Sequence, residues 1–110
     1  MRIDIVTLFP EMCENLLAES IIGRARARGH LQVCCHQLRR WGEGPHKRVD
    51  DCTFGGGKGM LLLAEPIAQA FEAVAEHTGV RPHILYMSPR GRVLDQEKVK
   101  TLAGYENLLI

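Results

Sequence analysis

Apolar and polar positions along the chain follow two periods, and each period predicts one kind of secondary structure. Residues 3–9 are mostly apolar or β-branched and stop at Pro10, a pattern typical of a buried strand. Similar runs predict three further strands, over residues 31–38, 83–87 and 107–110. Apolar side chains at helical spacing predict helices over residues 11–28, 65–78 and 94–103. Gly29 and Gly79 stand where the first two helices are expected to end.

The alternation of strand and helix periods predicts the fold class. It favours an α/β domain with a mainly parallel sheet, flanking helices and right-handed crossovers. The length of 110 residues corresponds to one domain. The sequence stops on the apolar residues 108–110, and we expect it to be the front part of a longer protein. As an unfinished strand, these residues would leave an unpaired apolar edge that promotes self-association.

Composition excludes several protein classes. Apolar residues make up 45% and charged residues 25% of the chain, values that argue against disorder, fibres and coiled coils. The longest apolar run, residues 60–64, is far shorter than a membrane span. Asp4 interrupts what would be the apolar stretch of a signal peptide. We therefore expect a cytoplasmic protein with no membrane association.

The net charge of +1 indicates no partner, but the charges are unevenly distributed. Residues 39–48 hold a single acid, Glu43, and His36 and His46 are close by. The four bases of this stretch are Arg39, Arg40, Lys47 and Arg48. Such a stretch is either a patch that contacts phosphates or an ordinary solvated basic loop.

The four cysteines do not indicate a metal site. They stand at Cys13, Cys34, Cys35 and Cys52, with no spacing that resembles a zinc motif. In a cytoplasmic protein their thiols are expected to be reduced. We expect no metal, and the role of the cysteines stays open.

Residues 41–59 form a glycine-rich stretch that we predict to be irregular. Four glycines, Gly55, Gly56, Gly57 and Gly59, surround Lys58. The order of residues matches neither a Walker A loop nor a dinucleotide-binding fingerprint. The stretch is either a flexible connection or a loop that a nucleotide approaches closely. On the second interpretation, a valine in place of Gly57 would obstruct the approach and disfavour a positive φ.

A second candidate segment follows the predicted strand 83–87. Ligands of parallel α/β sheets bind beyond the carboxyl ends of the strands. Ser88 offers a hydroxyl there, Pro89 stiffens the turn, and Gly91 permits close approach to the backbone. An ordinary turn between a strand and a helix would have the same composition.

Four motifs taken together resemble one family. They are residues 5–12 (IVTLFPEM), 23–25 (GRA), 49–60 (VDDCTFGGGKGM) and 88–96 (SPRGRVLDQ). In this order they closely resemble the bacterial tRNA (guanine-N1)-methyltransferases, which belong to the trefoil-knotted methyltransferases. The resemblance covers essentially all 110 residues, whereas family members continue well beyond Ile110. It implies that residues 1–110 are the N-terminal part of a single domain and end before the knot.

The resemblance also implies an activity and a set of site residues. The activity is transfer of a methyl group from S-adenosylmethionine to N1 of the guanosine just 3′ of a tRNA anticodon, by a homodimer. It assigns the cofactor side to Tyr86, Met87, Ser88, Pro89 and Gly91. It assigns the tRNA side to Asp50, Gly55, Gly56, Gly57 and Gly59.

No catalytic residue is expected within the chain itself. By the resemblance, the general base and the catalytic arginine both follow Ile110. Lys58 stands where some family members have proline or alanine, so no role is assigned to it. The alternative function is a non-catalytic α/β module that binds RNA or phosphate through the same basic and glycine-rich loops.

Overall fold

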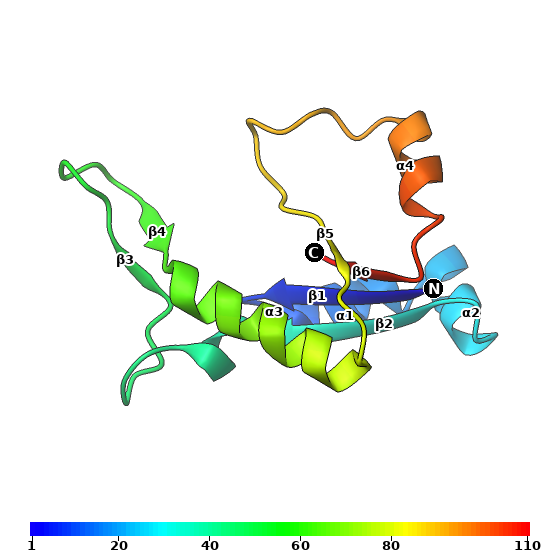
Figure 1. Ribbon diagram of the computed structural model, residues 1–110, viewed down its shortest axis with the longest axis horizontal. Helices are drawn as coiled ribbons and strands as arrows, with labels where there is room; N and C mark the ends of the chain where they lie inside the picture. Colours follow the sequence, from blue (N-terminus) through cyan, green and yellow to red (C-terminus); the bar gives the residue numbers. More distant parts are fainter.

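A four-stranded parallel sheet lies at the centre of the computed structural model, which describes residues 1–110 (Figure 1). The strand order is β2-β1-β6-β5, and every neighbouring pair is parallel. The strands are β1 (Arg2–Thr7), β2 (Gln32–Gln37), β5 (His83–Ile84) and β6 (Asn107–Leu109). The predicted α/β class with a mainly parallel sheet is confirmed, although β5 is shorter than the predicted strand 83–87.

The last strand occupies an interior position in this sheet. β6 lies between β1 and β5, with Leu108 opposite Ile3 on one side and His83 on the other. Leu108 and Leu109 are each only 5% exposed. The backbone of Ile110 is also bonded to β1, through Asp4 and Val6. The predicted unpaired apolar edge is therefore wrong, because pairing with the N-terminal strand covers these residues.

Helices cover both faces of the sheet. In Figure 1, α3 (Ala64–Thr78) lies in front of the strands and α1 (Pro10–Leu17) behind them. α3 ends at Gly79, whose φ of 68° is left-handed. α4 (Gln96–Leu102) begins at Asp95, whose side chain accepts a hydrogen bond from the Lys98 N–H. The helices predicted over 65–78 and 94–103 are confirmed to within one or two residues at each end.

The predicted continuous helix over residues 11–28 is wrong. The structure divides it into α1 and α2 (Ser20–Ala27). The break occurs at Glu19, which is extended, and at Ser20, whose φ is 54°. Gly23 then packs so closely on Ala18 that a Cβ would lie 1.9 Å from the Ala18 oxygen. This close contact allows the chain to bend where the apolar spacing alone would continue the helix.

Residues 38–62 contain regular elements that the sequence analysis did not predict. A short 3-10 helix, η1 (Leu38–Trp41), follows β2. β3 (Asp50–Cys52) and β4 (Met60–Leu62) then form an antiparallel hairpin that projects from the body of the molecule (Figure 1). Short exposed strands show no clear alternation of apolar and polar residues. The irregular stretch predicted over 41–59 is therefore wrong at Trp41, which belongs to η1, and at β3. None of the helices has the length and apolar character needed to cross a membrane.

Candidate functional site

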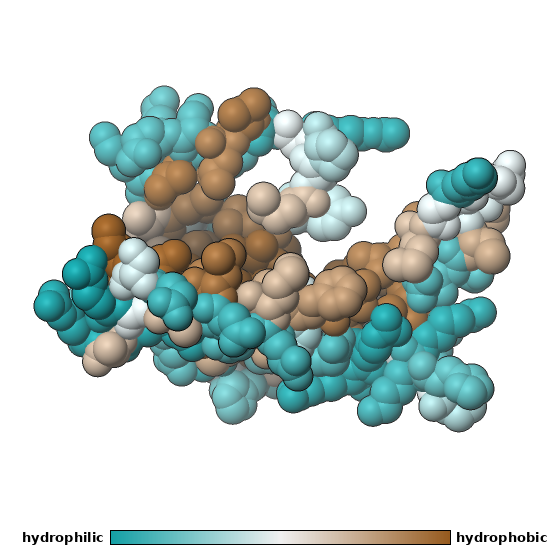
Figure 2. Space-filling model, turned by 180° about the vertical axis from the view of Figure 1, so that it is seen from behind, coloured by the Kyte–Doolittle hydropathy of each residue, from teal (hydrophilic) through white to brown (hydrophobic).

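The topology brings the two candidate segments to one edge of the sheet. Because all four strands are parallel, their carboxyl ends lie along the same edge. Residues 85–95 continue the chain from that edge after β5. The β3–β4 hairpin continues it from the same edge after β2 and η1. Both arms rise on the same side of the molecule in Figure 1. Figure 2 shows apolar residues on the recessed surface between them. This is the edge at which parallel sheets usually bind ligands.

The segment after β5 has free backbone groups and exposed side chains. The Leu85 N–H donates to Leu109 at 2.7 Å, the last bond of this segment to the sheet. The backbones of Tyr86 and Met87 make no hydrogen bond within the protein, and their side chains are 82% and 70% exposed. This part of the chain therefore presents donors, acceptors and apolar surface together.

A tight turn closes the same segment. The Gly91 N–H donates to the Ser88 carbonyl at 3.0 Å, and the Ser88 hydroxyl accepts a hydrogen bond from the Arg90 N–H at 3.2 Å. A Cβ on Gly91 would lie 3.1 Å from the Ser88 oxygen, which leaves little room for a side chain. The structure thus brings Ser88, Pro89 and Gly91 together as the sequence analysis expected.

The glycine loop forms the tip of the β3–β4 hairpin. The Thr53 hydroxyl donates to the Gly57 carbonyl at 2.7 Å and holds the loop closed. Gly55, Gly56 and Gly59 have φ values of 87°, 73° and 148°, a region that favours glycine. Gly57 has no positive φ, and a Cβ there would meet only the Thr53 hydroxyl, at 3.5 Å. The expectation that a side chain at Gly57 disfavours a positive φ is therefore wrong.

The hairpin also carries two carboxylates. Asp51 accepts a hydrogen bond from the Cys52 N–H at 2.8 Å, so its side chain stabilises the local backbone. Asp50 is half-buried at the base of the hairpin, and its carboxylate makes no hydrogen bond within the protein. Phe54, at the tip, is 99% exposed. Asp50 is thus an available acceptor below a loop that a ligand can reach from solvent.

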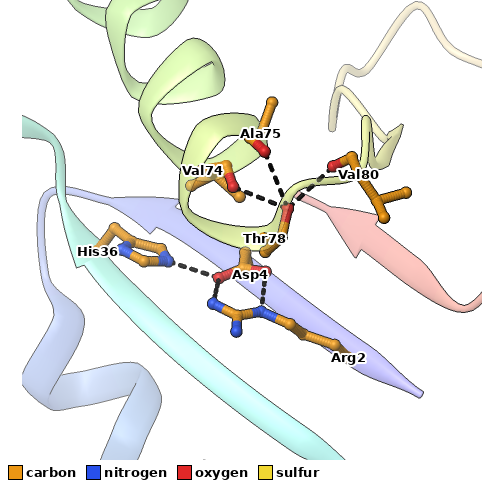
Figure 3. A network of polar contacts seen from close by, with 7 residues as sticks. All are labelled: Arg2, Asp4, His36, Val74, Ala75, Thr78 and Val80. Atoms are coloured by element: carbon orange, nitrogen blue, oxygen red, sulfur yellow. Dashed lines mark hydrogen bonds and ion pairs between the residues drawn. The ribbon is translucent and has the colours of Figure 1, made fainter.

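A buried polar network within the sheet was not predicted from the sequence (Figure 3). Asp4 on β1 is fully buried, and its two oxygens accept hydrogen bonds from Arg2 Nε at 2.8 Å and Arg2 Nη2 at 2.9 Å. His36 Nε2 on β2 lies 2.7 Å from Asp4 Oδ1. Burial alone would raise the pKa of Asp4, but the hydrogen bonds from Arg2 and His36 hold it below its usual value. The signal in the sequence was an acid at the centre of an apolar strand.

On the other face of the sheet, Cys35 lies beside a partly buried ion pair. Glu14 and Arg26 are joined at 2.9 Å between α1 and α2. Burial, together with the negative charge of Glu14, raises the pKa of Cys35 to about 11. No group of His, Cys, Asp and Glu side chains is arranged to hold a metal ion.

The raised pKa predicts that Cys35 reacts slowly with iodoacetamide at about pH 8. Only about one thousandth of a thiol with this pKa is ionised there, and the thiolate is the nucleophile. Cys52, which is exposed, should be modified first. Mass spectrometry of peptides after timed labelling measures both rates, and labelling in urea is the control in which the difference should vanish. Equal rates in the folded protein would contradict the prediction.

Comparisons with known proteins identify the family. The family model described as tRNA (Guanine-1)-methyltransferase TrmD matches residues 1–110. A tRNA (guanine-N(1)-)-methyltransferase of Geobacter metallireducens is 46% identical over 111 residues, which are 100% of this chain and 44% of that protein. The corresponding protein of Ruminiclostridium cellulolyticum is 41% identical over 110 residues, or 100% of this chain and 47% of that protein.

A solved structure shows the same fold. The crystal structure of tRNA (m1G37) methyltransferase from Aquifex aeolicus matches with a TM-score of 0.89 and 33% identity. The match covers 100% of this chain and 49% of that chain, so the chain spans about half the length of the relatives it matches. Both the sequence and the fold therefore agree with one assignment. The chain belongs to the tRNA (Guanine-1)-methyltransferase family.

Proposed function

We propose that residues 1–110 form the N-terminal part of a single domain that methylates N1 of the guanosine just 3′ of a tRNA anticodon. The observation that supports this most strongly is the position of the two candidate segments. In a chain of this family, both follow the carboxyl ends of parallel strands at one edge of the sheet. Methyl transfer requires the methyl donor and guanine N1 to be aligned at short distance, so two such arms on one edge suit the reaction.

The segment after β5 has the chemistry expected of the cofactor side. When bound, S-adenosylmethionine would supply the activated methyl group. Its adenine needs hydrogen-bond donors and acceptors, and the faces of the adenine ring and the methylene groups of the methionine part need apolar contact. The free backbone groups of Tyr86 and Met87 and their exposed side chains fit both needs. The turn formed by Ser88, Pro89 and Gly91 would allow the ligand to approach the backbone.

The β3–β4 hairpin is proposed as the tRNA side. Gly55, Gly56 and Gly59, with their positive φ values, are three positions of the loop that lack a side chain. Gly57 adds a fourth position without a side chain. Asp50 would accept a hydrogen bond from an exocyclic amine or order a water molecule near the guanine. No residue within the chain is proposed as the general base.

The location and assembly of the protein follow from the proposed activity. We propose a cytoplasmic enzyme, because its substrate is tRNA. We also propose a homodimer, for which the exposed apolar side chains of α1 and α2 provide support. Met12, Leu16 and Ile21 are all more than half exposed, which is unusual for side chains of this size.

The test is a chimera. Residues 1–110 replace the matching residues of the Geobacter metallireducens relative, which is 46% identical over this region. The chimera is expected to transfer label from S-adenosylmethionine to guanine N1 of unmodified tRNA, with the intact relative as reference. A folded chimera that binds tRNA but transfers no label would contradict the proposal and favour the RNA-binding module.

In the chimera, Gly56→Ala is expected to reduce methylation far more than Gly57→Ala. Alanine at Gly56 must adopt a φ of 73°, whereas alanine at Gly57 needs no positive φ and has room. The strain of about 1–3 kcal/mol should shift the loop and lower kcat/KM on the order of 10- to 100-fold. Steady-state kinetics of the pair, each with its urea midpoint, measures the effect. Equal kinetics would indicate that the loop is only a connection.

A further inference from the structure

Four cations that the proposed site does not use lie on one exposed surface. This surface, which we term the basic turn, consists of Arg39, Arg40, Lys47 and Arg48. All four side chains are exposed, and none forms an ion pair. The only acid in the segment, Glu43, is not paired with any of them. His36 does not belong to this surface, contrary to the sequence analysis, because Asp4 holds its ring.

The backbone explains why the two pairs of cations are brought together. Glu43 and Arg48 exchange two backbone hydrogen bonds of 2.8 Å, which reverse the chain. Gly42 packs so closely on Lys47 that a Cβ would lie 2.3 Å from the Lys47 oxygen. The Gly42 N–H also donates to Arg39 at 3.2 Å. Through these backbone contacts, Gly42 holds η1, which carries Arg39 and Arg40, against the segment that carries Lys47 and Arg48.

Buried side chains hold the turn in place at both of its ends. Leu38 and Val49 flank it and are almost completely buried, in one cluster with Ala70 of α3. Trp41 packs against the same cluster. The cations therefore project from a braced backbone, so less conformational entropy is lost when they bind than in a free loop.

We infer that the basic turn binds the phosphate backbone of the tRNA whose guanosine reaches the glycine loop. This inference rests on the proposed function. The buried Val49 continues directly into Asp50 and β3, so the basic turn and the hairpin are consecutive in the chain and both follow β2 at the carboxyl edge of the sheet. Phosphate contacts fix the position of a nucleic acid without reading its sequence. Unpaired arginines suit that task, because the guanidinium binds phosphate through two hydrogen bonds.

The experiment measures how tightly the 110-residue chain binds fluorescein-labelled tRNA, by anisotropy, between about 50 and 200 mM salt. Each phosphate contact contributes roughly 0.7–0.9 to the slope of log affinity against log salt. Replacing all four cations by glutamine should therefore reduce the slope by about 3 and weaken binding at least about tenfold at the lowest salt. A variant with lysine at the three arginine positions should keep most of the slope.

The matched control removes four cations at the other end of the molecule, in and next to α2 and α4 (Figure 1). Arg24, Arg28 and Lys100 are exposed, and Lys98 is half-buried. This control variant loses the same net charge as the basic-turn variant. It should reduce the slope of log affinity against log salt much less. The single tryptophan, Trp41, lies beside the turn, and its emission shows whether each variant keeps the local fold.

Three results would overturn the inference: equal slopes for the two quadruple variants, no binding of tRNA by the unaltered chain at low salt, or equally tight binding of phosphatidylserine vesicles. The methylation assay on the chimera is independent of these. A chimera that methylates tRNA although the basic turn has no effect on binding contradicts this inference alone. A turn that binds tRNA within an inactive chimera contradicts the proposed function alone.

Discussion

Residues 1–110 by themselves are expected to transfer no detectable label from S-adenosylmethionine to tRNA, whereas the chimera does. The reason is the openness of the candidate site. Tyr86 and Met87 are 82% and 70% exposed, so the segment after β5 forms one wall and leaves most of a bound ligand in water. Small-molecule sites usually bury about 70–90% of their ligand, and one wall cannot provide this.

A missing proton acceptor adds to the loss. The family resemblance places the general base after Ile110, and general-base assistance contributes on the order of 10²–10⁴ to the rate. Radiolabelled tRNA, digested and analysed for N1-methylguanosine, measures the activity, and Trp41 emission verifies that the chain is folded. Label at guanine N1 above a control without protein would contradict this prediction and would mean that one wall is sufficient.

Replacing Asp4 by alanine is expected to destabilise the fold by about 2–4 kcal/mol. Asp4 is completely buried, and its carboxylate is the only hydrogen-bond partner of the Arg2 guanidinium and the His36 ring. Without it, two charged or polar groups would lie against the sheet with no acceptor. Both retain 18% side-chain exposure, which allows some rehydration and keeps the loss below that of a fully buried pair.

Urea unfolding monitored by Trp41 measures this loss. The control is Glu72→Ala, because Glu72 and Arg81 are 3.8 Å apart and largely exposed. Removing such a surface pair should change the free energy of unfolding by less than about 1 kcal/mol. Losses of equal size in the two variants would show that the Asp4 network does not stabilise the fold.

The Asp4 network also predicts that the free energy of unfolding depends on pH. The pKa of Asp4 is lower in the folded chain than in the unfolded chain, where it is about 3.9. The contribution of Asp4 to stability is therefore fully present above about pH 5 and is lost as the pH falls through the folded value. Asp4→Asn should lack this component, so the difference in stability between wild type and variant should shrink below about pH 4. A difference in stability between wild type and Asp4→Asn that stays constant with pH would contradict this prediction.

Local patterns in the sequence were sufficient for the parallel sheet, for two of its helices and for the two candidate segments. The apolar runs and helical spacings identified four strands of the parallel sheet and the helices α3 and α4. They succeed because burial of one face imposes a period on each segment independently of its neighbours. The glycine loop and the Ser88–Gly91 turn were also recognisable, since glycine and proline mark backbone conformations that other residues avoid.

Contacts between distant residues decided the rest, and no local pattern encodes them. β6 becomes an interior strand only because it pairs with β1, which lies about a hundred residues earlier in the chain. The contact of Gly23 with Ala18 divides the first helix, and the contact of Gly42 with Lys47 assembles the basic turn. The Asp4 network likewise requires β1 and β2 to be in register, which places Asp4 within reach of His36. Such positions depend on which segments share the core, and only tertiary packing determines that.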